Sequence, residues 1–207
     1  DAFNLIRLGK ADAIVTGGSE ACVNEPSVGG FQNMKALSER NDDILTASRP
    51  FDKDRDGFVM GEGGACLILE DLEHAKARGA KIYSEIVGGG MTADAYHLTG
   101  THPEGIGAVL GMKEALREAG INADEIDYVN MHATSTAQGD ISELVAAKTV
   151  FGQRKDLFIS ATKSMTGHLL GAAGAIEAIA CAMALKDGQI PPTINTNEIE
   201  PDYIDLF

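Results

Sequence analysis

The sequence predicts an α/β fold, with strands and helices alternating along the chain. Short runs of β-branched and apolar residues are separated by longer segments whose apolar residues recur at helical spacing. Helices of this length between strands favour a mainly parallel sheet covered on both faces. Two of the expected strands end in turns that carry a histidine, His132 and His168. Because ligands gather at the carboxyl ends of strands in open α/β sheets, the pattern predicts a functional site at these turns.

The first portion, residues 1–80, is expected to hold two strands around a long irregular region. The run 13–16 ends in a glycine pair, and the run 65–69 follows a glycine-rich stretch. Prolines and glycines between these runs indicate a surface loop around a short helix near 32–38. Charged residues over 70–80 predict a helix that closes at a glycine.

The second portion, residues 81–207, follows a hinge near Gly79. Its patterns predict strands at 81–87, 126–131 and 157–160 and helices at 103–119, 142–150 and 169–186. Gly120 is expected to cap the first of these helices. The final residues, 204–207, resemble a further strand.

Composition narrows the possible function classes. A chain of 207 residues that is 44% hydrophobic can bury a substantial core, and no apolar run is long enough to cross a bilayer. The net charge of −14 argues against nonspecific nucleic-acid binding. Three cysteines without metal or redox spacing, and first residues without a signal-peptide pattern, favour a reducing cytoplasm. The first residues read as the middle of a helix, so we expect a piece of a longer protein.

An acidic partner would need a local basic patch on so acidic a chain. The basic residues that cluster in the sequence are Lys35, Arg40, Arg49, Lys53 and Arg55. Ordinary solvated charge explains the cluster as simply as a binding patch does.

The turn at His168 has three unusual features. Lys163 precedes the histidine, and a helix rich in glycine and alanine follows it. Gly171 and Gly174 each weaken that helix by about 1 kcal/mol relative to alanine, which indicates close approach of another backbone or a ligand. Glu177 is a charge on a helix that is expected to be buried, and Lys163 is its nearest candidate partner.

The turn at His132 is rich in hydroxyl groups. Thr134 and Thr136 follow the histidine, and hydroxyls at this density can cap a helix or hydrogen-bond a polar substrate arm. Asp140 is placed to cap the helix 142–150. Capping does not explain a histidine at a strand end, so we interpret this turn as functional.

Other patterns suit structural roles better. Residues 52–57 imitate the first half of a calcium loop, but the bidentate glutamate that the pattern requires is missing. His97 and His102 share a loop without a third ligand nearby, so a metal site there is a minor alternative. No nucleotide-binding glycine pattern opens a helix after a strand, and each cysteine is expected to serve packing.

Several segments resemble those of the β-ketoacyl-acyl carrier protein synthases. Residues 132–140, HATSTAQGD, resemble the H-G-T-S-T-x-x-x-D segment of that family, and residues 163–174, KSMTGHLLGAAG, resemble its K-S-x-x-G-H-x-x-G-A-A-G segment. The stretches 48–52, 56–63 and 191–194 are also similar to that family. The similarity is strongest to the synthase II branch of bacterial type II fatty acid synthesis and runs over essentially the whole chain.

The resemblance implies a thiolase-like fold, in which two similar α/β halves form five layers, α-β-α-β-α, usually in a homodimer. Residues 1–80 would be the end of the first half and residues 81–207 most of the second, so the fold would be incomplete in this chain. In the family a nucleophilic cysteine precedes the region present here, and a segment with a gating phenylalanine follows it. We therefore expect the 207 residues alone to be inactive.

The implied activity is a decarboxylative Claisen condensation, an acyl transfer in fatty acid elongation. His132 and His168 match the two family histidines, which as neutral imidazoles donate N–H groups to the thioester oxygen of malonyl-acyl carrier protein. Lys163 matches the family lysine, and Glu177 matches the acidic residue that contacts it. No metal or resident cofactor is implied, because the substrates travel on the phosphopantetheine of acyl carrier protein.

The resemblance also implies binding residues and partners. Thr134 and Thr136 match threonines that hold the phosphopantetheine arm, and Phe31 matches an acyl-pocket residue. Lys35 matches a basic position that meets the acidic carrier protein. Acyl carrier protein and a second copy of the chain are the expected partners, in the cytoplasm, with no nucleic acid or membrane.

Two residues depart from the family pattern, and alternatives to the enzyme stay open. Ala133 replaces a glycine, which would be poorly tolerated at positive φ, and Ala137 replaces a proline, which loosens the turn. The alternatives are a noncatalytic chain-length-factor-like partner, a polyketide-type ketosynthase and, matching less well, a thiolase-fold enzyme that uses coenzyme A. A cysteine at the nucleophile position would indicate the enzyme, and another residue there the noncatalytic partner.

Overall fold

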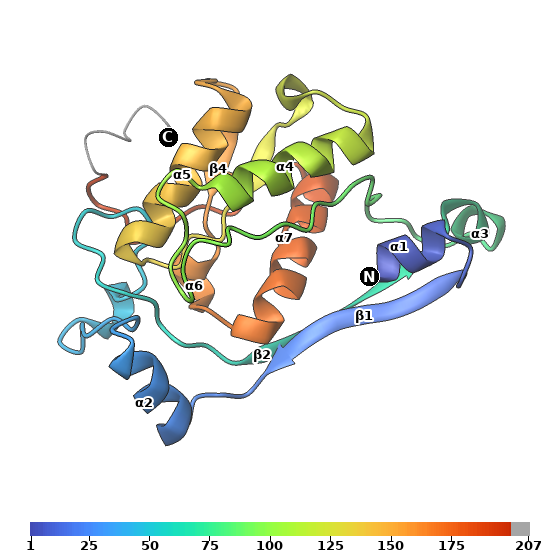
Figure 1. The fold of residues 1–207 in the computed structure, drawn as a ribbon. Helices are drawn as coiled ribbons and strands as arrows, with labels where there is room; N and C mark the ends of the chain where they lie inside the picture. Colours follow the sequence, from blue (N-terminus) through green and yellow to red (C-terminus); the bar gives the residue numbers. More distant parts are fainter. Residues whose placement is uncertain (200–207) are drawn as a thin grey trace.

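The computed structural model describes residues 1–199, which form a mixed α/β fold (Figure 1). The first portion contains α1 (Ala2–Arg7), β1 (Ala13–Glu20), α2 (Glu25–Asn33), η1 (Ile44–Thr46), β2 (Gly63–Glu70) and α3 (Leu72–Ala77). The second portion contains α4 (Ile106–Ala119), η2 (Ala123–Glu125), β3 (Tyr128–Asn130), α5 (Ala137–Phe151), β4 (Phe158–Ser160), α6 (Lys163–Thr166), η3 (Leu170–Ala172) and α7 (Ala173–Asp187). The η elements are single turns of 3-10 helix.

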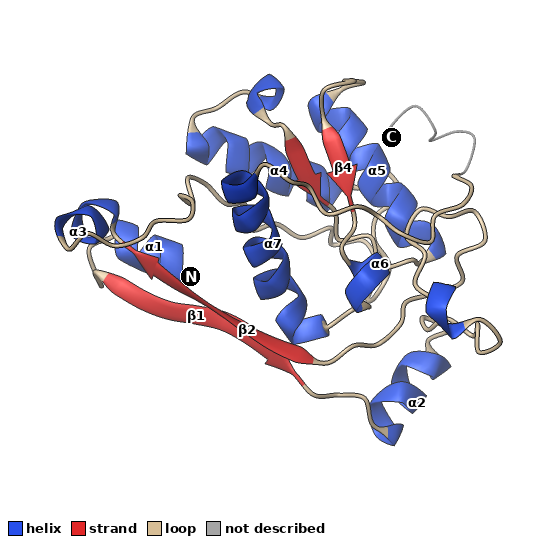
Figure 2. Ribbon diagram, turned by 180° about the vertical axis from the view of Figure 1, so that it is seen from behind, coloured by secondary structure: helices blue, strands red, loops and turns tan. Residues whose placement is uncertain are grey.

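A long ribbon of β1 and β2 runs along one edge of the molecule (Figure 2). The two strands are antiparallel, with Ala13 opposite Glu70. Burial alternates along both strands, and Val15 and Ile68 on the outward face are 71% and 70% exposed. The expectation of a parallel sheet is wrong for this pair, because such alternation belongs to antiparallel strands that pack on one face only.

Helix α7 packs against the ribbon, next to η3 (Figures 1 and 2). A Cβ atom on Gly18 of β1 would lie 2.0 Å from the carbonyl oxygen of Gly171, so the two backbones are in contact. The close approach predicted from Gly171 is therefore confirmed. A Cβ atom on Gly174 would have no described atom within 4 Å, so the same prediction is not met at that residue.

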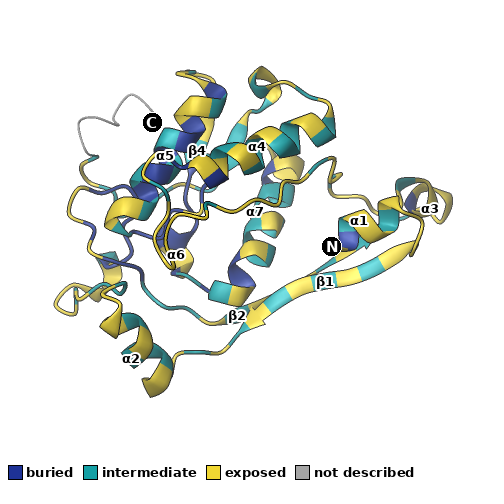
Figure 3. Cartoon of the chain, in the orientation of Figure 1, coloured by how far each residue is buried: buried dark blue, intermediate teal, exposed yellow. Residues whose placement is uncertain are grey.

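The second sheet is the parallel pair β3–β4, which confirms the predicted arrangement for this portion. Its strands are joined through α5, and α4 packs on α5. The main core includes Met131, Leu144 and Phe151 from this portion. Phe51, from the loop before β2, joins the same core and is 2% exposed. Figure 3 shows many of the buried residues around α5 and α6.

Some predicted boundaries shift for local reasons. Helix α2 begins before the predicted range because the Asn24 side chain accepts the N–H of Ser27 and Pro26 suits the first helical turn. Residues 81–87 form no strand, because this segment pairs with no neighbour within residues 1–199. Gly120 caps α4 at φ +70°, as predicted.

The strand predicted at 204–207 lies outside the described residues. Within residues 1–199, no helix has both the length and the apolar character needed to cross a bilayer.

Candidate active site

The structure brings the two predicted histidines together. The ring centroids of His132 and His168 are 5.0 Å apart, with the rings nearly perpendicular at 87°. His132 follows β3, and His168 follows the short helix α6. Two turns far apart in the sequence therefore form one site.

The turn at His132 is held by a carboxylate that the sequence reasoning missed. Glu143 of α5 accepts the backbone N–H of His132 at 2.6 Å and that of Ala133 at 2.7 Å. Burial raises the pKa of Glu143 to about 7, and the two N–H donors oppose that rise. An acidic residue one helical turn after Asp140, on the same apolar helix, was the signal that could have identified it.

Asp140 holds the next part of this turn. It lies inside the first turn of α5 and not before the helix, so the predicted cap of 142–150 is misplaced. Its carboxylate accepts the N–H of Ser135 at 3.1 Å and the N–H of Phe51 at 2.9 Å. Burial raises the pKa of Asp140 to about 6, against the opposing effect of these bonds and Arg55. Asp140 therefore ties the turn to the loop before β2.

The two departures from the family pattern fit this structure. Ala133 is 1% exposed and packs in the main core. The positive φ in this turn, +73°, occurs at Ser135 and not at Ala133, so the added methyl is not strained. Ala137 is the first residue of α5, a position that accepts most residues as well as proline.

The turn at His168 is held by backbone pairing. The N–H of His168 donates to the carbonyl of Val59 at 2.7 Å, and the N–H of Gly61 donates to the carbonyl of His168 at 2.9 Å. Gly167 precedes the histidine at φ +66° and ψ −170°, a conformation largely confined to glycine. The N–H of Leu170 donates to Nδ1 of His168 at 3.2 Å. In the neutral ring the proton is therefore on Nε2, which leaves Nε2–H free to donate.

Lys163 and Glu177 form the ion pair that the sequence predicted. The side chain of Lys163 is 1% exposed and that of Glu177 is 19% exposed. A buried ammonium group is tolerated because the carboxylate neutralises it. The pair joins α6, which precedes the turn at His168, to α7, which follows it.

Both imidazoles are neutral at pH 7. Loss of hydration in the packed site, and then the positive charge of Lys163, lower the pKa of His168 to about 4. The same two causes and the neighbouring His168 lower the pKa of His132 to about 3. His132 keeps solvent-exposed surface, and its lowered pKa leaves the ring without an added proton near neutrality.

Phe58 is a second residue that the sequence reasoning missed. Its ring lies edge-on between Phe31 and His168, with centroid distances of 5.2 Å and 5.3 Å. The predicted acyl-pocket residue Phe31 is therefore linked to the histidines through Phe58. An aromatic residue in the glycine-rich stretch 56–63 was the available signal.

The predicted basic cluster does not form a surface patch. Arg49 and Arg55 are 6% and 7% exposed, so they are unavailable to an acidic partner. Lys53 pairs with Glu198, and Arg40 donates to the carbonyl of Asp54. Lys35 is exposed just after α2, so it is the residue of this cluster that an acidic partner could contact.

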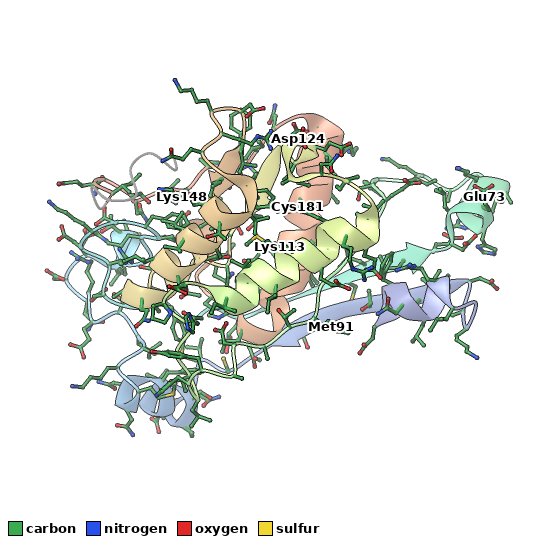
Figure 4. All side chains as sticks on the ribbon, turned by 45° about the horizontal axis from the view of Figure 1, so that its top comes forward. Glu73, Met91, Lys113, Asp124, Lys148 and Cys181 are labelled. Atoms are coloured by element: carbon green, nitrogen blue, oxygen red, sulfur yellow. The ribbon has the colours of Figure 1, made fainter. Side chains whose placement is uncertain are left out.

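The alternative patterns have structural roles. Nδ1 of His97 accepts the N–H groups of Thr99 and Gly100, and Nδ1 of His102 accepts the N–H of Glu104, so both rings organise their own loop. No cluster of metal-ligand residues occurs in the described part of the chain. The three cysteines are free, and burial raises the pKa of the Cys181 thiol on α7 (Figure 4).

Two family models match this chain. Residues 1–75 match the model of the β-ketoacyl synthase N-terminal domain, and residues 83–197 match that of the β-ketoacyl synthase C-terminal domain. The chain belongs to the β-ketoacyl synthase family. The 3-oxoacyl-[acyl-carrier-protein] synthase 2 of Vibrio cholerae is 52% identical over 201 residues, which are 96% of this chain and 49% of that protein.

Solved β-ketoacyl synthase structures share the fold. A β-ketoacyl synthase from Burkholderia phymatum has a TM-score of 0.92 at 43% identity, over 98% of this chain and 50% of that one. A ketosynthase solved with its type II polyketide acyl-carrier protein and a hexaketide has a TM-score of 0.94 at 41% identity, over 97% of this chain and 50% of that one. The predicted thiolase-like fold is confirmed, and the chain spans about half the length of the curated relatives it matches.

Proposed function

We propose that the protein containing this chain is a β-ketoacyl-acyl carrier protein synthase II, which condenses an acyl group with malonyl-acyl carrier protein in fatty acid elongation. The observation that carries the proposal is the pair of neutral imidazoles, 5.0 Å apart, beside the buried ammonium of Lys163. Curated relatives named 3-oxoacyl-acyl carrier protein synthase 2 support the choice of substrate. The two imidazoles, His132 and His168, can each direct an N–H donor at a developing negative charge and so stabilise it.

The proposed reaction has two stages. A cysteine thiolate outside these 207 residues attacks the thioester of acyl carrier protein, takes the acyl group and expels the carrier as its thiolate. Malonyl-acyl carrier protein then binds with its thioester oxygen facing His132 and His168. When the bond to the carboxylate breaks, carbon dioxide leaves and the electron pair forms an enolate, whose oxygen accepts the imidazole N–H groups. The α-carbon attacks the acyl carbon and expels the cysteine thiolate.

The neutral state of the histidines is central to this chemistry. An imidazolium that lost its proton to the enolate would quench the carbanion before it attacked. Lys163 helps to prevent protonation because its charge lowers both histidine pKa values, and Glu177 balances that charge within the protein.

The proposal includes partners and location. Thr134 and Thr136 would hold the phosphopantetheine arm, and Lys35 would meet the acidic carrier protein. We propose a homodimer in the cytoplasm, with no resident cofactor or metal. Because the nucleophile would come from elsewhere in the protein, the 207 residues alone would not condense substrates.

The retained chemistry favours the enzyme over a noncatalytic chain-length-factor-like partner. A subunit without a nucleophile has no need for two neutral imidazoles and a buried lysine pair, which cost stability to maintain. The geometry does not by itself distinguish fatty acyl from polyketide substrates, and the identity to synthase 2 relatives supports the fatty acyl choice.

The test is carbon dioxide release from malonyl-acyl carrier protein by the full-length protein. His132→Ala and His168→Ala should each reduce decarboxylation about 100-fold or more, because each removes an N–H donor aimed at the enolate oxygen. His74→Ala is the matched control, since His74 lies exposed on α3 and pairs with Glu70. Undiminished decarboxylation in both site variants would contradict the proposal.

A further inference from the structure

The threonine pair of the first turn stands on a strained backbone. The Oγ1 atoms of Thr134 and Thr136 are 3.1 Å apart, and Ser135 between them has φ +73°. A left-handed conformation costs a non-glycine residue about 1 kcal/mol or more. The orientation of the two hydroxyls therefore depends on contacts that keep Ser135 in this conformation.

Three hydrogen bonds hold Ser135. Its N–H donates to Oδ1 of Asp140 at 3.1 Å, and its Oγ accepts the backbone N–H of Arg49 at 3.1 Å. Its carbonyl accepts the N–H of Gly57 at 3.0 Å. Two of the three partners come from the loop before β2, so the turn is held across the two portions of the chain.

Arg55, from the same loop, holds the residues that follow. Its guanidinium donates to the carbonyl of Thr136 at 3.0 Å and to the carbonyl of Ala137. It also donates to the carbonyl of Asp52 at 2.9 Å, and its Nε lies 3.6 Å from Oδ2 of Asp140. The Arg55 side chain is 3% exposed, so these bonds form away from water. A planar guanidinium can bind adjacent carbonyls at once, which a lysine ammonium cannot reproduce.

We propose that Arg55 is a positioning residue for the phosphopantetheine arm. It fixes the backbone at Thr136 and Ala137, and thereby holds the hydroxyls of Thr134 and Thr136 where the arm binds. Arg55 acts through the turn and does not touch the substrate. The inference rests on the proposed function, which gives the two threonines their role.

The chain supplies a matched control in Arg49. It is as buried as Arg55, and its guanidinium pairs with Asp52 at 3.6 Å. Its other side-chain bonds go to the carbonyl and hydroxyl of Thr46, at 2.9 Å and 2.6 Å. Arg49 contacts the threonine turn through its backbone N–H, which a substitution to lysine preserves.

The experiment compares Arg55→Lys with Arg49→Lys in the full-length protein, using malonyl-acyl carrier protein decarboxylation. Both variants should lose stability to a similar extent in urea unfolding. Only Arg55→Lys should raise KM, by about tenfold, the value of one charge-assisted hydrogen bond. Its kcat should fall far less than its KM rises, because the histidines stay in place.

A double-mutant cycle with Thr136→Val tests whether Arg55→Lys raises KM through the hydroxyl of Thr136. If Arg55 acts through Thr136, Arg55→Lys should add little to KM once the hydroxyl is gone, whereas independent effects would multiply. Should Arg55→Lys not accumulate as folded protein, Arg55→Gln is measured in the same way, because its two amide N–H groups cannot replace the donors to three carbonyls.

Three results would each overturn the inference alone: an unchanged KM in folded Arg55 variants of an active protein, an equal rise in Arg49→Lys, or effects on KM that multiply with those of Thr136→Val. Absence of decarboxylation by the wild-type protein would instead overturn the proposed function, and this inference with it.

Discussion

The two histidine turns are close in space but are held by different kinds of contact. The turn at His132 is fixed by side-chain carboxylates, since Glu143 and Asp140 accept three of its backbone N–H groups between them. The turn at His168 is fixed by backbone bonds to Val59 and Gly61. The first turn therefore depends chiefly on charged side chains, with one backbone bond from Gly57 to Ser135 beside them, and the second depends on the close approach of two main chains.

This difference determines which changes each turn can tolerate. Carboxylates can be removed or protonated, so the first turn should respond to side-chain substitution and to pH. Hydrogen bonds between backbone groups survive most substitutions, but they break when an added side chain pushes the two bonded segments apart.

Adding a methyl group at Gly167 should disrupt the second turn most. A Cβ atom there would lie 2.8 Å from the carbonyl oxygen of Val59, the acceptor for the N–H of His168. Gly167→Ala should destabilise the protein by about 4 kcal/mol, the sum of backbone strain and overpacking. Urea unfolding and decarboxylation rates measure the two consequences.

Gly152→Ala is the control for that change. Gly152 has φ +71° and ψ −165°, close to the φ +66° and ψ −170° of Gly167, and an added Cβ there would meet nothing within 4 Å. It should cost only the strain, about 2 kcal/mol, and leave the decarboxylation rate unchanged. Equal losses in both variants would mean that contact with Val59 does not hold the turn.

Removing the carboxylate of Glu143 should loosen the first turn. Glu143→Ala leaves the N–H groups of His132 and Ala133 without their acceptor, at a cost of about 2 kcal/mol. Decarboxylation should fall because His132 is no longer fixed. Glu114→Ala, which removes an exposed partner of Arg117, should change neither quantity. A first turn that stayed active without Glu143 would remove the proposed contrast.

Two groups of the site, His168 and Glu143, should give pH dependences of opposite sign. Folded His168 has a pKa of about 4, so the unfolded chain gains its proton first as the pH falls below about 6.5, and stability is lost towards pH 4. Folded Glu143 has a pKa of about 7 against an ordinary 4.5, so its folded state holds the extra proton and stability falls as the pH rises from 4.5 to 7. The measurement is the unfolding free energy of the wild-type protein against pH. Its difference from that of His168→Gln should give the first slope, and its difference from that of Glu143→Gln should give the second. Parallel curves for all three proteins would refute the assignment.

The smallest effects concern the starts of the following helices. Thr136 has φ −91° and ψ 144°, which suits the residue before a proline, so Ala137→Pro should stabilise the protein by about 0.5 kcal/mol. Ala173→Pro should destabilise it, because Ala172 is in the α region and the N–H of Ala173 donates to the carbonyl of Leu170. Thermal unfolding of the two variants should give shifts of opposite sign.

Much of the site could be predicted because its residue types are unusual for a core. His132, His168 and Lys163 stand out as polar groups beside apolar strands and helices, and the charge of Glu177 required a partner. Glu143 was missed because one acid on a helix is ordinary until its distance to a backbone N–H is known. The buried arginines were misassigned as surface charge, since sequence clustering does not show which way a side chain points.

The α/β class, the parallel pair β3–β4 and the family could be predicted from the residues alone, because local apolar patterns and dense polar motifs carry that information. The antiparallel pairing of β1 with β2, and the bonds from the segment 57–61 to both histidine turns, became visible in the folded chain and in no local pattern. Strand pairing and buried ion pairs join residues distant in the chain, and their geometry depends on packing that no local pattern specifies.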